Sequence, residues 1–125
     1  MTLKLPTLSQ DVLAIAGSFD EGVVHVRFVG TADIEAKADL IAIVKAMHDE
    51  VIRLTATKVV LDLRGLEFMN SSSFKIFVTW LTRIQDLPPA EQYRVHLLAN
   101  PNLHWQRRSL AALSCFAVDL VTIEM

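Results

Sequence analysis

A nearly continuous apolar run in the middle of the chain, residues 57–63 (TKVVLDL), places the strongest constraint on the fold. Strands with one face in water alternate apolar and polar residues, whereas an unbroken apolar centre is typical of a strand covered on both faces. Such a strand lies inside a sheet and needs a neighbouring strand on each side. The run therefore predicts a central strand, and the segments before and after it must supply the rest of the sheet.

Two runs rich in β-branched residues precede this strand and predict a β-hairpin. They cover residues 12–15 and 23–29, and the turn-forming residues 17–22 separate them. The second run has an apolar face and a mixed face: Val24, Val26 and Phe28 on the first, and Val23, His25, Arg27 and Val29 on the second. We therefore expect one face of this strand to be better covered than the other.

One helix is expected before the central strand in the sequence and another after it. Residues 30–33 stop the second strand, and Asp33 is a suitable N-cap for a helix over residues 34–54, which lack Gly and Pro. Its apolar residues recur at spacings of three, four and seven, which predicts one apolar side. After a connection over residues 64–69, a second helix opens at residues 70–73, and the prolines at 88 and 89 end it.

The rest of the chain continues this alternation. It predicts a strand over residues 93–98, a third helix that carries Leu103, Leu110 and Leu113, and a last strand over residues 116–123. Strands that alternate with helices through short links indicate an α/β fold. We expect residues 1–125 to form a single domain, whose mixed sheet of about five strands is parallel after its opening hairpin and carries three to four helices.

Charge and cysteine content exclude several classes of function. With Cys115 as the single cysteine, an intramolecular disulfide is impossible and a cysteine-built zinc site is unsupported, which fits a reducing compartment. The net charge of −2 gives no reason to expect binding to nucleic acid or to an anionic membrane. Charges interrupt every apolar run before it reaches the length of a membrane span, and the N-terminus lacks a signal-peptide pattern. We therefore expect a cytoplasmic protein without a membrane span.

The sequence shows no catalytic, metal-binding or cofactor-binding motif. Its four histidines lie far apart: His25, His48, His96 and His104. Because no Gly-rich phosphate loop occurs either, we expect a protein that is not an enzyme and holds neither metal nor cofactor. Cys115, at the edge of the last strand, is expected to be a buried small apolar residue. Residues 105–108 (WQRR) are expected to form a solvated basic face with a half-buried Trp; contact with a phosphate or an acidic partner is the alternative.

The segment whose side chains could undergo a chemical modification is the serine run at the start of the second helix, residues 70–73 (NSSS). Asn and Ser are preferred N-caps, so helix capping alone explains the run. The alternative is a regulatory phosphoserine, because the positive end of a helix tolerates a phosphate. A phosphate adds about −1.5 to −2 charges. If a partner docks on Phe68, Met69 and Phe74, the interface must desolvate that charge, and the complex dissociates.

The residues GTAD (30–33) and above all the block VVLDLRGLEFMNSS (59–72) resemble the STAS domain, the fold of bacterial anti-sigma factor antagonists. The resemblance covers about residues 10–123. It implies a small cytosolic switch protein that binds a regulatory partner, often a serine kinase of the anti-sigma type, and releases it when phosphorylated. It maps the phosphoacceptor onto Ser71, with Ser72 and Ser73 as alternatives. It also implies a partner-binding surface: Gly30, Thr31, Asp33, Phe68, Met69, Asn70 and Phe74.

Three departures from that family keep other functions open. Asn70 stands where the family has Asp, Ser73 where it has Gly, and the chain stops at Met125 where many members continue into a further helix. These departures favour a constitutive scaffold or subunit, for example in a stress-signalling complex or beside the ATPase of a transporter. A small anionic ligand held by the serine run and Arg64 is a third possibility. Surface that the missing helix would cover is left to a second copy of the chain, to another partner, or to three leucines: Leu3, Leu5 and Leu8.

Overall fold

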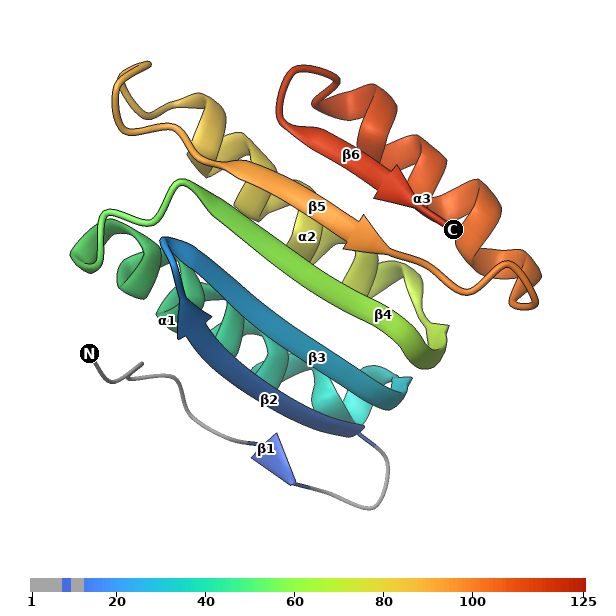
Figure 1. The fold of residues 1–125 in the computed structure, drawn as a ribbon. Helices are drawn as coiled ribbons and strands as arrows, with labels where there is room; N and C mark the ends of the chain where they lie inside the picture. The colour runs from blue at the N-terminus through green and yellow to red at the C-terminus, as the bar shows by residue number, and fades with distance from the viewer. Residues whose placement is uncertain (1–7, 10–12) are drawn as a thin grey trace.

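The computed structural model describes residues 8–9 and 13–125, which form one sheet and one layer of helices (Figure 1). In chain order the elements are β1 (Leu8–Ser9), β2 (Leu13–Asp20), β3 (Val23–Ala32), the 3-10 turn η1 (Ile34–Ala36), α1 (Lys37–Arg53), β4 (Lys58–Met69), α2 (Ser71–Gln85), β5 (Arg94–Leu98), α3 (His104–Phe116) and β6 (Val121–Glu124). Val12 of the first predicted run, Leu3, Leu5 and the side chain of Leu8 lie outside the described residues.

The strands lie in the sheet in the order in which they occur in the sequence, from β1 to β6. β2 pairs antiparallel with β1 and with β3, whereas β3, β4, β5 and β6 pair in parallel. This arrangement confirms the predicted α/β fold with an opening hairpin and parallel strands after it. β4 lies between β3 and β5, so the apolar run over residues 57–63 does form an interior strand.

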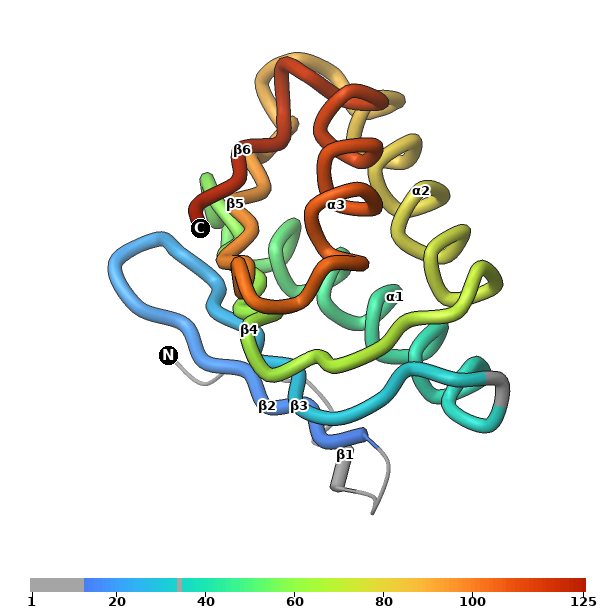
Figure 2. The backbone as a smooth tube through the Cα atoms, turned by 90° about the vertical axis from the view of Figure 1, so that its right-hand side faces the viewer, coloured from blue at the N-terminus to red at the C-terminus, as the bar shows by residue number. Residues whose placement is uncertain are grey.

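The three α-helices lie on the same side of the sheet, as Figure 2 shows. Each helix joins two adjacent parallel strands, and right-handed crossovers that always advance in one direction place every helix on one face. Helices therefore cover β4 on one face only, so the prediction that β4 is covered on both faces is wrong. Val60, on the opposite face, is still only 9% exposed, because His25 and His96 lie in register with it on the two neighbouring strands.

The core lies between the sheet and the helices, and the predicted apolar faces fill it. On β3, Val24, Val26 and Phe28 are buried as expected, while His25 and Arg27 on the other face are exposed. The Phe28 ring meets the ring of Phe77 from α2 edge-on, at a centroid distance of 5.9 Å. The alternation in the sequence therefore decides which face of β3 meets the helices.

The hairpin is tighter than predicted. β2 extends to Asp20, and the turn consists of Glu21 and Gly22, whose φ angles are 50° and 79°. Two consecutive positive φ angles match the twist of a two-residue hairpin turn. The predicted stop at residues 30–33 is also wrong: Gly30 adopts a φ of 114° beside a register shift, and β3 continues to Ala32.

The boundaries around the first helix and β4 also differ from the prediction. Asp33 accepts the N–H of Glu35 on Oδ1 at 3.0 Å and so caps η1, while α1 begins only at Lys37. Residues 64–69 are the second half of β4 and not a connection. Gly65 permits the close approach of β3 there, because a Cβ at this position would lie 3.1 Å from Cγ2 of Val29.

The end of the chain holds a longer helix and a shorter strand than predicted. The N–H of Ala117 still donates to the carbonyl of Leu113 at 3.2 Å, so α3 continues through Cys115, and β6 begins only at Val121. Cys115 is therefore exposed on α3, and the expectation of a buried cysteine beside a strand is wrong. The basic face is confirmed for Arg107 and Arg108, which are exposed beside the half-buried Trp105, whereas Gln106 of the same segment is buried.

Candidate partner-binding site

The predicted partner-binding residues lie at one end of the molecule, where β3 and β4 end side by side. Thr31 pairs with Phe68 in the parallel ladder. Gly30 precedes Thr31 on β3, and Asp33 and Asn70 follow directly after the two strands. The fold thus brings together two segments that are far apart in the sequence.

The apolar residues of this end differ in their exposure. Phe68 is 49% exposed, whereas Met69 and Phe74 are half-buried and pack against the core. Of these three residues, Phe68 is therefore the most accessible to another molecule.

Asn70 and Ser73 fasten the start of α2 to the end of β3. The Oδ1 atom of Asn70 accepts the N–H of Ser73 at 2.9 Å, which makes Asn70 the N-cap of α2. The Asn70 N–H donates to the carbonyl of Ala32 at 3.0 Å, and the Ser73 hydroxyl donates to the same carbonyl at 3.4 Å. Both positions at which the chain departs from the STAS pattern therefore carry structural hydrogen bonds.

The three serines of the run have different access to solvent. Ser71 is exposed, Ser72 is half-buried and Ser73 is 0% exposed. Within the described part of the chain, the N–H groups of Ser71 and Ser72 have no acceptor, as is usual in the first turn of a helix. Ser71 thus presents a free hydroxyl at the positive end of the α2 dipole.

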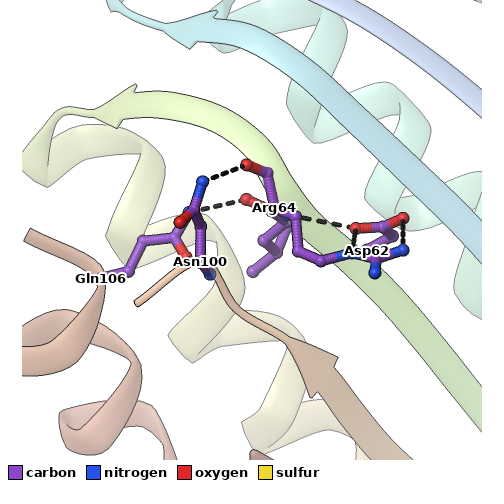
Figure 3. Close-up of polar contacts among 5 residues, drawn as sticks. Asp62, Arg64, Asn100 and Gln106 are labelled. Carbon is purple, nitrogen blue, oxygen red and sulfur yellow. Dashed lines mark hydrogen bonds and ion pairs between the residues drawn. The ribbon is translucent and has the colours of Figure 1, made fainter. Parts of the chain in front are cut away.

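A buried glutamine of α3 holds the second half of β4 in place (Figure 3). Gln106 is 0% exposed, and its Nε2 donates to the carbonyls of Leu63 at 2.6 Å and Leu66 at 3.0 Å. Its Oε1 accepts the N–H of Asn100 at 2.7 Å. The side-chain amide of Asn100 donates in turn to the carbonyl of Arg64 at 3.1 Å. These bonds tie the strand that carries Phe68 to the loop before α3.

Sequence reasoning missed Gln106, although a signal was present. Gln106 precedes Leu110 by four residues and Leu113 by seven, and this spacing places it on the apolar face of α3. A polar residue on such a face is buried and needs hydrogen-bond partners. The amide supplies two donors and an acceptor to backbone groups near the irregular part of β4.

Arg64 belongs to a different surface from the serine run. Its Nε and Nη2 atoms each donate to Asp62, at 2.9 Å, as Figure 3 shows. These hydrogen bonds hold the pKa of the Asp62 carboxyl below its usual range. Since its guanidinium is engaged by a carboxylate two residues away, Arg64 gives no support to an anion site at the serine run.

Within residues 8–9 and 13–125, no three His, Cys, Asp or Glu side chains form a group that could hold a metal ion. Among the same residues, no helix has both the length and the apolar character that crossing a membrane requires.

No protein-family model matches the sequence, and no curated protein matches it. Solved structures do match the fold. An anti-sigma factor antagonist from Mycobacterium paratuberculosis is similar with a TM-score of 0.63 at 20% sequence identity, over 86% of this chain and 84% of that chain. SpoIIAA, an anti-sigma factor antagonist, is similar in its unphosphorylated form with a TM-score of 0.60 at 20% identity, over 90% and 89% of the two chains. The chain has a STAS-like fold.

The phosphorylated form of the Bacillus cell fate determinant SpoIIAA is also similar, with a TM-score of 0.57 at 19% identity, over 90% of this chain and 92% of that chain. These matches confirm the resemblance that residues 59–72 indicate. In this STAS-like fold the block spans β4 and the first turn of α2, so the most specific part of the sequence forms the candidate site.

Proposed function

We propose that this STAS-like protein is a cytoplasmic, non-enzymatic interaction module of the anti-sigma factor antagonist type. Its partner is a regulatory protein such as an anti-sigma-type serine kinase, and it docks where β3 and β4 end beside α2. Phosphorylation of Ser71 releases the partner. The observation that carries this proposal is the exposed hydroxyl of Ser71 at the amino end of α2, close in the chain to the half-exposed Phe68.

The physical basis of the switch is the contrast between an apolar contact and a charged group. A phosphate adds about −1.5 to −2 charges and strong hydration, which an interface centred on Phe68 would have to remove. The N–H groups of the first turn and the helix dipole stabilise that phosphate in the free protein. Ser71 is favoured over Ser73, because the Ser73 hydroxyl is buried and bonded to Ala32.

The test compares Ser71→Glu and Ser71→Ala with the unmodified chain in binding to the partner recovered from the native cell. We expect Ser71→Ala to bind like the unmodified chain and Ser71→Glu to bind at least about tenfold more weakly. Ser18→Glu is the matched control, because Ser18 is exposed on β2, on the face of the sheet that the helices do not cover. A phosphosite analysis of protein from stressed and unstressed cells must also find Ser71 modified.

A constitutive scaffold is the second candidate, and the bonds of Asn70 and Ser73 favour it. These side chains fix the start of α2 without an acidic group beside the serine hydroxyl. A scaffold predicts that Ser71→Glu and Ser71→Ala bind the partner equally well. The same binding series therefore distinguishes the two candidates.

A further inference from the structure

A groove between α1 and α2 opens to solvent and has a volume of about 440 Å³. Four apolar side chains line it. Val44 and Trp80 are buried, whereas solvent reaches Ile41 and Ile76. Ile41 is 47% exposed, which makes it one of the large apolar side chains that the described chain leaves uncovered. The groove therefore offers an apolar floor to another molecule.

Two rows of cations flank this floor. Lys37 and Lys45 lie on α1, and Lys75 and Arg83 lie on α2. In each row the two residues are eight positions apart, or about 12 Å along the helix axis. α1 and α2 run in the same direction, because each returns from the end of one parallel strand to the start of the next. The two rows therefore line the groove on both sides.

Within the described part of the chain, no ion pair engages the cations of the groove. None of the described lining residues is acidic, and none of the four cations forms an ion pair with another described residue. The chain as a whole carries a net charge of −2, so the groove is opposite in sign to the protein around it. A ligand that fits must combine an apolar surface with negative charge on both flanks.

We propose that this groove binds an acidic amphipathic helix of a partner protein. The apolar stripe of such a helix lies on Ile41, Ile76 and Trp80, and acidic residues two turns apart on each flank meet the cations. Burial of the stripe gives affinity, while the charges select the partner and its orientation. The groove runs along α1 and α2 and reaches Ser72 in the first turn of α2, so it adjoins the Ser71 site, although neither Ser71 nor Phe68 lines it.

Other occupants fit the layout less well. A single phosphate or carboxylate has no apolar surface and would leave the floor of Ile41, Ile76 and Trp80 uncovered. A membrane surface contacts protruding apolar side chains, whereas Val44 and Trp80 lie at the bottom of the groove, 5% and 2% exposed. A helix fits both the length of the cation rows and the depth of the apolar floor.

The test uses the full chain and a model peptide of about 18 residues, or five helical turns. The peptide carries a leucine stripe flanked by glutamates, and a twin carries lysines in their place. Because Trp80 lines the groove, its fluorescence reports binding once Trp105 is replaced by Phe. We expect the glutamate peptide to shift this emission in a salt-dependent manner and the lysine peptide to leave it unchanged.

Charge reversal then locates the binding. Lys45→Glu with Lys75→Glu is expected to weaken binding of the glutamate peptide at least about tenfold. Arg107→Glu with Arg108→Glu makes the same change in net charge on the exposed side of α3 and is expected to change binding less than about twofold. Ile41→Ala, which keeps every charge, is expected to weaken binding as well. Circular dichroism confirms that each variant is folded.

Four results would overturn this proposal. They are equal losses in the two charge-reversal variants, binding of the lysine peptide, absence of binding to either peptide, and binding of phosphatidylglycerol vesicles through Lys45 and Lys75 in place of the peptide. A concentration-dependent dimer that Ile41→Glu abolishes would instead assign the groove to a second copy of the chain. The peptide experiments use neither the regulatory partner nor a Ser71 variant, so different measurements test the groove and the switch, and failure of one is distinguishable from failure of the other.

Discussion

The Nδ1 atom of His48, on α1, lies 2.6 Å from the hydroxyl oxygen of Tyr93, which precedes β5. The same hydroxyl accepts the indole N–H of Trp80, on α2, at 2.7 Å. Because the indole is always a donor, the proton of the Tyr93 hydroxyl is available for His48, whose Nδ1 must then be unprotonated. Burial raises the pKa of Tyr93, so the hydroxyl keeps that proton. A neutral His48 that accepts the Tyr93 proton on Nδ1 satisfies both contacts and links the two helices to the residue that precedes β5.

The first prediction is a loss of stability in mild acid. Burial, assisted by Arg83 and opposed by Asp49, lowers the pKa of His48 below its ordinary value of 6.5. Near and below pH 6.5 the unfolded chain therefore binds more protons at His48 than the folded chain does, and the free energy of unfolding falls as the pH falls. Urea unfolding between about pH 7.5 and pH 5.5 measures this.

His48→Gln is the control for this prediction, since a glutamine accepts a hydrogen bond and does not titrate. Its pH dependence is expected to be flatter than that of the unmodified chain. The remaining histidines are common to both proteins, so their contributions cancel in the comparison. Parallel pH profiles for the two proteins would contradict the assignment to His48.

The second prediction concerns the hydrogen bonds by which the Gln106 side chain holds β4. Gln106→Ala leaves the carbonyls of Leu63 and Leu66 and the N–H of Asn100 without their partner. Buried groups without partners are destabilising, so we expect a loss of about 2–3 kcal/mol in the free energy of unfolding. The control is Gln85→Ala, because the exposed Gln85 amide makes only a 3.4 Å bond to Phe116; its change should stay within about 0.5 kcal/mol. Equal changes in the free energy of unfolding for the two substitutions would refute a stabilising role of the Gln106 hydrogen bonds.

Periodicity in the sequence was sufficient to predict the fold class and the buried faces. The alternation of Val24, Val26 and Phe28 and the helical spacing of Phe77, Leu81 and Ile84 depend on local geometry alone, and all six residues are buried. The serine run at the start of α2 was also predictable, because capping involves neighbours in the sequence.

Features that depend on pairing between distant segments were not predictable in this way. The continuation of β4 through residues 64–69 depends on its ladder with the end of β3 and on the absence of a Cβ at Gly65. The apolar Val60 resembles a residue covered by a helix, yet in-register strand neighbours bury it. Side-chain networks such as that of Gln106 join α3 to β4, and sequence spacing within one element does not reveal their partners.

The third prediction tests whether the role of Asn70 is to cap α2, by comparing its replacement by Ala with its replacement by Asp. Asn70→Ala removes the acceptor for the Ser73 N–H and should destabilise the protein by about 1 kcal/mol. Asn70→Asp keeps the acceptor and adds a negative charge at the positive end of α2, so its stability should be within about 0.5 kcal/mol of the unmodified chain. Thermal and urea unfolding measure both values. A loss of stability in Asn70→Asp as large as that in Asn70→Ala would show that Asn70 is required for more than capping.

The fourth prediction tests the proposed interface without disturbing the fold. Phe68 is 49% exposed, so Phe68→Ala should lower the free energy of unfolding by only about 1 kcal/mol, roughly half the effect of a fully buried phenylalanine. If Phe68 is the central contact of the partner, the same substitution should weaken partner binding at least about tenfold, because buried aromatic side chains dominate interface energies. Phe116→Ala provides a matched control, since Phe116 is 45% exposed at the end of α3. Binding to the partner recovered by native pull-down, measured with all three proteins, decides the matter: equal binding by Phe68→Ala and Phe116→Ala would remove the end of β4 from the interface.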